Sequence, residues 1–143
     1  MSVDETSVAD QLLAMQTIAV VGLSKDPSKP SHDVAKYLQA KGYRIIPVNP
    51  TINEVLGEKC YPSLLSLPDD LKRQIDVVDI FRRSEDVGPI VDEAIKLYQT
   101  YEHPKGIWMQ LGIIDEASAE RARDAGLQVV MDRCMKIEHN RNR

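Results

Sequence analysis

The residues best suited to chemistry follow a short apolar run, TIAVVGL, at positions 17–23. The next segment is rich in small, hydroxyl-bearing and cationic side chains, and a helical pattern begins directly after it, near His32. Unpaired N–H groups at a helix N-terminus attract anions, so this loop suits a phosphate or pyrophosphate group. The loop offers Gly22, Ser24, Lys25, Lys29 and Ser31 to such a group, and Ser31 is also expected to cap the helix.

The loop matches neither of the common phosphate-binding fingerprints. Of the glycines in the dinucleotide pattern G-x-G-x-x-G only the first is present, as Gly22, and serine, lysine and proline stand at the positions that follow. The G-K-[ST] ending of a Walker A loop is also absent. A purely structural interpretation stays open, in which Gly22 makes a tight turn and Ser31 caps a helix without contacting a ligand.

A second cationic group follows the apolar run at 75–81. Phe81, Arg82, Arg83 and Ser84 are consecutive and precede another helical pattern, which Ser84 is expected to cap. An arginine can pair bidentately with a phosphate or lie flat on a purine ring. An aromatic ring and two guanidinium groups are therefore expected at a second helix N-terminus, where they could meet a ligand. The alternative is that Phe81 fills the core and the arginines are solvated, as surface arginines commonly are.

Polar or reactive residues also stand near the ends of the other apolar runs. Gln110 lies at the end of the run at 106–111 and needs hydrogen-bond partners if it is buried. Cys134 follows the run at 127–132, where a thiol beside Arg133 could meet a thiol on a ligand, although a single cysteine is usually inert. Further candidates are Asn49 and Pro50, which close the second run, and Trp108 and Met109, for which a place in the core is the alternative.

Residues for catalysis or for a bound metal do not form a recognisable set. The sequence has no Ser-His-Asp order, no G-x-S-x-G elbow and no close carboxylate pair in a loop that follows a strand. His32, His103 and His139 lack metal-ligand spacing with one another and with the cysteines. Asp76 and Asp79 lie within one apolar run and are expected on one face of it. We therefore expect binding rather than catalysis, and no metal.

Length and composition indicate one globular domain. The chain has 143 residues, of which 43% are hydrophobic and 28% are charged, as is ordinary for a globular protein. The net charge of −4 argues against nucleic-acid binding, which depends on broad clusters of lysine and arginine. Two distant cysteines, an N-terminus without an apolar leader and the lack of a membrane-length apolar run favour a cytoplasmic protein without membrane contact. A homodimer could form through exposed helix faces.

The candidate residues are carried by elements whose patterns alternate between strand and helix. Short, continuous apolar runs are typical of strands buried on both faces of a parallel sheet, and the intervening segments have helical periodicity. Strands are expected at 17–23, 43–48, 75–81, 106–111 and 127–132. Helices are expected within a lead-in segment at 1–16 and at 32–41, 85–100 and 115–125, with short helices near 63–66 and 69–73 and a frayed charged tail at 136–143.

This order of elements predicts an α/β fold of the Rossmann-like, doubly wound type, with a mainly parallel five-stranded sheet and helices on both faces. In such sheets, ligands bind beyond the carboxyl ends of the strands, near the place where the strand order reverses. Most of the candidate residues stand at these ends. The fold therefore predicts that residues far apart in the sequence meet in one binding site.

Four segments resemble, in this order, the CoA-binding domain family, in the stand-alone group related to the N-terminal domain of the succinyl-CoA synthetase α subunit. The segments are IAVVGLSKDPSKPSHDVAKYLQAKGYRIIPVNP, DVVDIFRRSEDVGPIVDEAI, GIWMQLGI and AGLQVVMDRCMKIEH, and the resemblance covers residues 12–139. It implies that coenzyme A, free or acylated, lies across the ends of the strands.

The resemblance also implies a role for each candidate residue. The CoA phosphates would meet Gly22, Ser24, Lys25 and Ser31, and the adenosine would lie near Asn49 and Pro50. The ligand would be flanked by Phe81 and Arg82, and its pantetheine arm would lie along Trp108, Met109 and Gln110. The phosphohistidine and the second domain of the synthetase have no counterpart in this sequence, so ligase activity is not expected.

These observations predict a CoA-binding protein that holds CoA or an acyl-CoA without ligase activity. One alternative is an enzyme that acts on an acyl-CoA or on a nicotinamide nucleotide. The nicotinamide version is disfavoured because Asn49 occupies the place of the acidic residue that follows the second strand in NAD-binding domains. Another alternative is a subunit that docks on a partner protein through its N-terminal helix.

Overall fold

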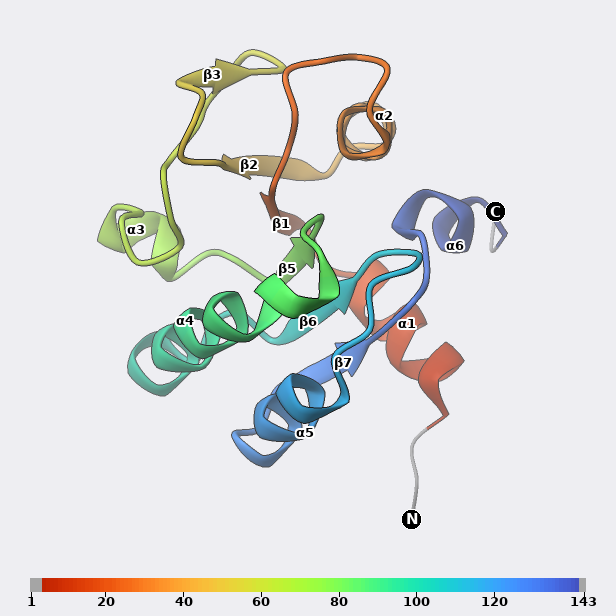
Figure 1. Ribbon diagram of the computed structural model, residues 1–143, viewed down its shortest axis with the longest axis vertical. Helices are drawn as coiled ribbons and strands as arrows, with labels where there is room; N and C mark the ends of the chain where they lie inside the picture. Colours follow the sequence, from red (N-terminus) through yellow and green to blue (C-terminus); the bar gives the residue numbers. More distant parts are fainter. Residues whose placement is uncertain (1–3, 142–143) are drawn as a thin grey trace.

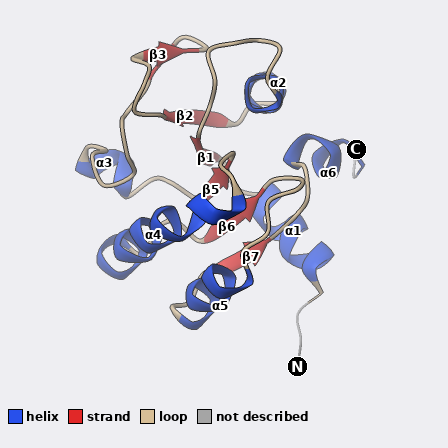
Figure 2. Cartoon of the chain, in the orientation of Figure 1, coloured by secondary structure: helices blue, strands red, loops and turns tan. Residues whose placement is uncertain are grey.

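The computed structural model describes residues 4–141 and confirms the expected fold class (Figure 1, Figure 2). The strands of the main sheet are β1 (Thr17–Val21), β2 (Arg44–Val48), β5 (Val77–Ile80), β6 (Gly106–Met109) and β7 (Gln128–Val130). They are all parallel and stand in the order β2-β1-β5-β6-β7. Every residue of β1, β5 and β6 is buried, which explains why these strands stand out in the sequence as apolar runs.

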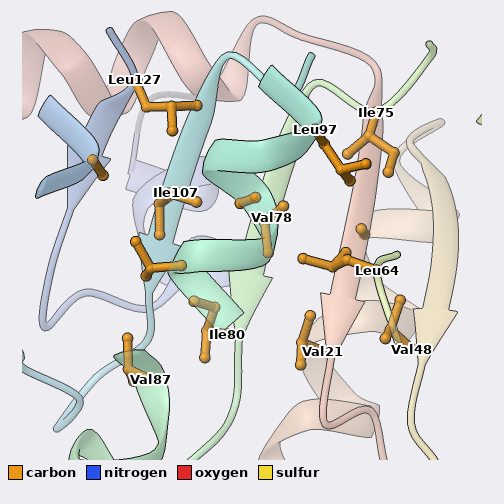
Figure 3. Close-up of a cluster of buried hydrophobic side chains, with 14 of the residues drawn as sticks. Val21, Val48, Leu64, Ile75, Val78, Ile80, Val87, Leu97, Ile107 and Leu127 are labelled. Atoms are coloured by element: carbon orange, nitrogen blue, oxygen red, sulfur yellow. The ribbon is translucent and has the colours of Figure 1, made fainter. Parts of the chain in front are cut away.

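Helices cover both faces of the sheet. One face carries α1 (Glu5–Leu13), α2 (Pro30–Ala40) and α6 (Met135–Arg141), and the other carries α3 (Asp69–Lys72), α4 (Val87–Tyr101) and α5 (Glu116–Asp124) (Figure 1). Side chains alternate between the two faces along each strand, so β1 gives Ile18 and Val20 to the first core and Ala19 and Val21 to the second. Figure 3 shows the second core, in which side chains of β1, β2, β5 and β6 meet those of α4.

The strand order reverses at β1. From β1 the chain passes through α2 to β2 on one side, and β5, β6 and β7 follow on the other side. Because α2 and α4 lie on opposite faces of the sheet, the carboxyl ends of β1 and β5 border a crevice between two diverging crossovers. The loops at 22–29 and 81–83 therefore reach the same edge of the sheet.

The helices expected at 32–41 and 115–125 end close to the predicted positions. Gly42 follows α2 with a φ of +97°, and Gly126 follows α5 with a φ of +109°, in a region that glycine enters without steric cost. Asp115 caps α5 through its side chain, which accepts a hydrogen bond from Ser118 N at 3.4 Å. These ends depend on local backbone chemistry, which is why the sequence predicts them well.

Ser31 and Ser84, in contrast, do not cap helices. α2 begins at Pro30, two residues before the expected start at His32, and has no side-chain cap. Proline at the first helical position supplies the helical φ and needs no partner for an N–H group. Ser31 Oγ instead accepts a hydrogen bond from Ser24 N. Ser84 starts a short 3-10 helix, and its Oγ accepts from a backbone N–H of the loop after β6. Both serines tie loops together at the carboxyl edge of the sheet.

The expected fraying of the charged tail is wrong as far as residue 141, because residues 135–141 form α6. One side of this helix is held against the domain: Met135 is fully buried, and Glu138 and His139 are nearly so. His139 Nδ1 shares a 2.8 Å hydrogen bond with the Tyr37 hydroxyl of α2, and the two rings meet edge to face. The segment was expected to fray because it is rich in charged residues, but Glu138 is one of the buried residues that hold the helix to the domain.

Residues 51–73 hold a small hairpin that the sequence did not reveal. β3 (Glu54–Val55) and β4 (Glu58–Lys59) pair antiparallel around Leu56 and Gly57, which both have positive φ, as a two-residue hairpin turn requires. Leucine is rare at such a position, so the turn signal was weak. Of the two short helices expected here, the one near 69–73 is present as α3, whereas residues 63–66 form turns.

Candidate functional site

A cavity of about 580 Å³ lies at the carboxyl edge of the sheet, where the strand order reverses. Its size falls within the range of small-molecule and cofactor sites. It is formed by the loop between β1 and α2, by the segments that leave β5 and β6, and by the start of α6. The candidate residues that line it are Gly22, Ser24, Ser31, Phe81, Arg82, Gln110 and Cys134. The topology thus brings together most of the predicted site.

Gly22 allows the end of β1 to approach the end of β5. Its φ is +88°, and a Cβ atom at this position would stand 2.2 Å from the carbonyl oxygen of Phe81. Gly22 N also donates a hydrogen bond of 2.8 Å to Val48 O at the end of β2. Any side chain at position 22 would push apart the strand ends that border the cavity.

Side-chain hydrogen bonds hold the loop after Gly22 in place. Ser31 Oγ accepts from Ser24 N at 2.9 Å, and His32 Nδ1 lies within hydrogen-bond distance of Ser24 O, also at 2.9 Å. Asn49 Nδ2 donates to Leu23 O at 3.0 Å from the end of β2. The loop is therefore fixed before a ligand binds, which lowers the entropy lost on binding.

Arg82 is a cation that the cavity presents without a partner. Its side chain is half-buried and forms no hydrogen bond or ion pair with another residue of the described chain, 4–141. Arg83, by contrast, is exposed and pairs with Glu85 at 3.2 Å and with Asp86 at 3.0 Å. The first turn of α2, which also borders the cavity, has backbone N–H groups that no side chain caps. A free guanidinium and an uncapped helix N-terminus in one cavity attract an anion.

The opposite end of the cavity is formed by the segments after β6 and β7. Gln110 is buried, and its Oε1 accepts from Met135 N at 3.1 Å, which fixes the start of α6. Gly112 N donates to Asp132 Oδ1 at 2.7 Å, and this bond joins the two loops. Cys134 is partly exposed and borders the cavity. A thiol therefore lies at the end of the cavity away from β1.

The guanidinium of Arg133, the neighbour of Cys134, is engaged in ion pairs. Its Nε lies 3.2 Å from a carboxylate oxygen of Glu5 in α1, and its Nη1 lies 3.3 Å from Glu138 in α6. Arg133 therefore joins the first helix to the last one. This contact gives it a structural role beside the cavity.

Five candidate residues do not line this cavity. Trp108 and Met109 are fully buried on opposite faces of β6, and Trp108 Nε1 donates to a backbone carbonyl at 2.8 Å. Lys25 is exposed and outside the lining. Asn49 is buried as the tie described above, and Pro50 lines a second cavity of about 230 Å³. Arg82 borders both cavities, so the second one continues the first toward β2.

Sequence reasoning missed most of the apolar lining of the larger cavity. Pro30, Val34, Leu111, Ile113 and Ile137 all border it. For the loop after β6 the sequence held one indication: apolar residues continue after Gln110, as LGII, although the strand has ended. Ile137 gave no signal, because the segment that contains it was expected to be frayed.

Asp79 is a buried carboxyl group at the centre of the sheet. It lies in β5 opposite Val20 of β1 and Trp108 of β6, and neither of its oxygens has a hydrogen-bond partner among the described residues. Burial raises the pKa of Asp79 well above that of a free aspartate. The expectation that Asp76 shares its face is wrong, since Asp76 precedes β5 at the other edge of the sheet and accepts hydrogen bonds from the backbone at the start of β1.

Metal-ligating side chains do not gather anywhere between residues 4 and 141: no group of three or more His, Cys, Asp or Glu could hold an ion there. In the same part of the chain, none of the helices combines the length and the apolar character needed to cross a bilayer. The cavity at the carboxyl edge lies where folds of this type bind ligands, so it is the candidate binding site.

The fold is a Rossmann-like domain of the kind that binds ligands. Its strand order reverses at β1, Gly22 lets the ends of β1 and β5 approach each other, and a cationic cavity lies at that edge of the sheet. The family described as CoA binding domain matches residues 16–140. The chain therefore belongs to the CoA-binding domain family, and the resemblance noted in the sequence is confirmed.

Relatives similar to this chain over most of its length come from bacteria and archaea. YneT of Bacillus subtilis is 38% identical over 135 residues, which are 94% of this chain and 93% of YneT. The solved structure of a hypothetical protein from Pyrococcus horikoshii has a TM-score of 0.85 at 37% identity, over 98% of this chain and 92% of that one. The protein called cell-free ID.343 from Thermus thermophilus has a TM-score of 0.83 at 35% identity, over 97% and 98% of the two chains.

Part of the chain is also similar to ADP-forming acetate–CoA ligases. The match to acetate–CoA ligase (ADP-forming) II of Archaeoglobus fulgidus is 37% identical over 65 residues, which are 44% of this chain and 10% of the ligase. The similarity to these enzymes thus covers a small segment of each ligase.

Proposed function

We propose that this protein binds coenzyme A, free or acylated, in the cavity at the carboxyl edge of the sheet and holds it without ligase activity. The observation that carries the proposal is Arg82, a half-buried guanidinium without a partner in the described chain, in a cavity that also takes in the uncapped start of α2. CoA has several phosphate charges, and a cation that is partly withdrawn from water binds phosphate more strongly than a solvated one. Membership of the CoA-binding domain family supports this ligand over other phosphate esters.

The polarity of the two cavities supports one orientation of the ligand. The phosphates would lie between Arg82 and the start of α2. The adenine would enter the smaller cavity toward β2, whose lining includes Pro50, Pro62 and Ile90. The pantetheine arm would run the other way, past Gln110, and bring the CoA thiol toward Cys134.

The chemistry of the lining supports binding without turnover. No Asp, Glu or His is among the described residues that border the larger cavity, so it lacks the carboxylates and imidazoles that most often serve in general acid–base catalysis. The similarity to the ligase also covers only 10% of that enzyme, which gives little reason to transfer its activity to this chain. If the protein hydrolysed acyl-CoA thioesters, incubation with acetyl-CoA would release free thiol faster than in buffer, and we expect no such release.

The first test is native mass spectrometry of the purified protein with and without reductant, followed by calorimetric titration with CoA, acetyl-CoA, NAD and ATP. We expect CoA and acetyl-CoA to bind more tightly than NAD and ATP. A CoA mass that reductant removes would indicate a disulfide between Cys134 and the CoA thiol. A folded sample that binds none of the four ligands, or that prefers NAD, would contradict the proposal.

Replacing Arg82 tests the site itself. Arg82→Ala removes charge-assisted hydrogen bonds to phosphate and should weaken CoA binding by about 1 to 3 kcal/mol, or roughly 5- to 150-fold in Kd. The matched control is Arg44→Ala, which removes an exposed arginine at the amino end of β2, on the opposite edge of the sheet. Equal CoA affinity in the two variants would mean that the phosphates bind elsewhere.

A further inference from the structure

Exposed apolar side chains gather at one end of the larger cavity. The large apolar residues with exposed side chains in the described chain are Leu65, Leu111, Ile114 and Ile137. Leu111 is 64% exposed and Ile137 is 51% exposed, and both border the cavity, whereas Ile114 belongs to the same loop as Leu111. Exposed apolar side chains that stand together at the rim of a cavity are placed to contact a ligand in it.

Arg82 and the apolar residues come from different elements: Arg82 lies at the exit of β5, whereas the apolar residues lie in the loop after β6 and in α6, which follows β7. α6 also lies against the first turn of α2, where Lys136 Nζ is 2.9 Å from Asp33 Oδ2, so Ile137 is held at the rim of the cavity. In Figure 1 the loop after β6, in cyan, runs beside the blue segment that enters α6. The hydrogen bond from Gly112 N to Asp132 Oδ1 holds these two segments together. Leu111 and Ile113 therefore stand on one side of this end, and Ile137 stands on the other, with Cys134 at the same end.

We infer that the apolar end receives the acyl group of an acyl-CoA thioester, so that the protein binds apolar acyl chains of medium length more tightly than it binds free CoA. The inference rests on the proposed function and names the class of ligand. A cavity that is cationic at one end and apolar at the other complements an amphipathic anion. Free CoA would end at its thiol, near Cys134, and would leave Leu111 and Ile137 in water.

A second copy of the chain is the other occupant to consider for this surface. A stable interface between proteins buries about 800 Å² on each partner. Three partly exposed aliphatic side chains supply much less than this area, and the apolar surface continues into a cavity that a flat partner would not fill. An acyl chain, in contrast, needs a narrow apolar track that begins where the thioester ends.

The size of the effect follows from the area covered. Complete burial of one methylene group tightens binding about fourfold. A chain that lies in an open groove is covered on about one side, which gives about half of that free energy, or about a twofold gain per methylene. From butyryl-CoA to octanoyl-CoA, which differ by four methylene groups, the Kd should therefore fall roughly fifteenfold.

The test is calorimetric titration of the full chain with CoA, butyryl-CoA, hexanoyl-CoA and octanoyl-CoA. The readout is the ratio of the Kd for CoA to the Kd for each thioester, because this ratio cancels any change in binding of the CoA part. We expect the ratio to rise with chain length in the unaltered protein and to stay near one in the double variant Leu111→Ser, Ile137→Ser. Leu65→Ser is the matched control, since it removes an exposed leucine that does not border the cavity, and it should keep the full rise.

The outcomes separate this inference from the proposed function. If CoA binds and octanoyl-CoA binds no more tightly, the inference is wrong and the proposed function stands. If neither CoA nor any thioester binds, the proposed function fails first. Sedimentation of the same samples tests whether a second copy of the chain occupies this surface. If the unaltered protein is a dimer, the double variant is a monomer and chain length has no effect on the Kd, the apolar surface serves self-association and the inference is wrong.

Discussion

Asp79 places a carboxyl group where its neighbours in the sheet are apolar. It is fully buried, and desolvation raises its pKa because nothing in the described chain stabilises the charged form. Below about pH 4 the carboxyl is protonated in both the folded and the unfolded chain, so it has no pH-dependent effect on stability. As the pH rises, the unfolded chain ionises first, and folding stability falls by up to about 1.4 kcal/mol per pH unit until the folded state also loses the proton.

Asp79→Asn should remove this loss of stability. The amide keeps the shape of the carboxyl and does not ionise, so the free energy of unfolding of the variant relative to the unaltered protein should increase steadily above pH 4. Urea unfolding at several values between pH 4 and pH 8 measures the difference. The substitution is controlled by Asp124→Asn at an exposed position, where the difference should not change with pH in this way. A constant difference for Asp79→Asn would mean that the carboxyl ionises without cost.

At the scale of elements, the approach of β1 to β5 depends on Gly22. Alanine at this position would have to adopt a φ of +88° and would bring its Cβ to 2.2 Å from a backbone oxygen that cannot turn away. The left-handed conformation alone costs about 1 to 2 kcal/mol, and separating the strand ends adds to this. We expect Gly22→Ala to lower the free energy of unfolding by about 3 kcal/mol or more and to weaken CoA binding strongly.

A second glycine, Gly57, separates the cost of the left-handed conformation from the cost of the steric clash. Gly57 also has a positive φ, of +75°, but a Cβ there would meet no atom within 4 Å. Gly57→Ala should therefore cost only about 1 kcal/mol, with unchanged CoA affinity. Denaturant unfolding and calorimetry of both variants give the comparison. Equal losses of stability would mean that the β1–β5 contact adapts to a side chain at position 22.

The elements that the sequence predicts correctly are those governed by burial on both faces. β1 and β5 appear as apolar runs because helices cover both sides of the sheet, and once the strands are known, the strand exits identify Gly22, Arg82, Gln110 and Cys134. Trp108 and Met109 lie in β6, two positions and one position before Gln110, and the apolar run does not show at which residue the strand leaves the sheet. Their complete burial results from packing against helices on both faces of the sheet, which the local sequence does not show.

The other differences between sequence and structure also arise from long-range contacts. Ser31 and Ser84 satisfy the local rule for a helix cap, yet both accept hydrogen bonds from other loops. Ile137 faces the cavity because His139, on the same helix, is bonded to Tyr37 of α2, more than a hundred positions earlier in the chain. Local patterns carry no information about such partners.

At the scale of the whole molecule, the charge distribution favours a small anion over a large one. The net charge is −4, so a polyanionic surface meets overall repulsion, whereas the cavity combines Lys29 and the unpaired Arg82 within a lining without carboxylates among the described residues. The loops around it are held by their own hydrogen bonds. Binding should therefore leave the fold unchanged and act mainly as added stability.

Thermal unfolding with increasing CoA tests this linkage in the intact protein. A ligand that binds only the folded state stabilises it by about 2.7 kcal/mol at a concentration of 100 times the Kd. For a domain of this length the midpoint of unfolding should rise by about 8 °C. Arg82→Ala at the same CoA concentration should retain a rise of only about 2 to 3 °C if its Kd is about thirty times higher. Equal rises in the two proteins would mean that the stabilising ligand is not held by the cationic end of the cavity. An equal rise with NAD in place of CoA would mean that the cavity does not select CoA.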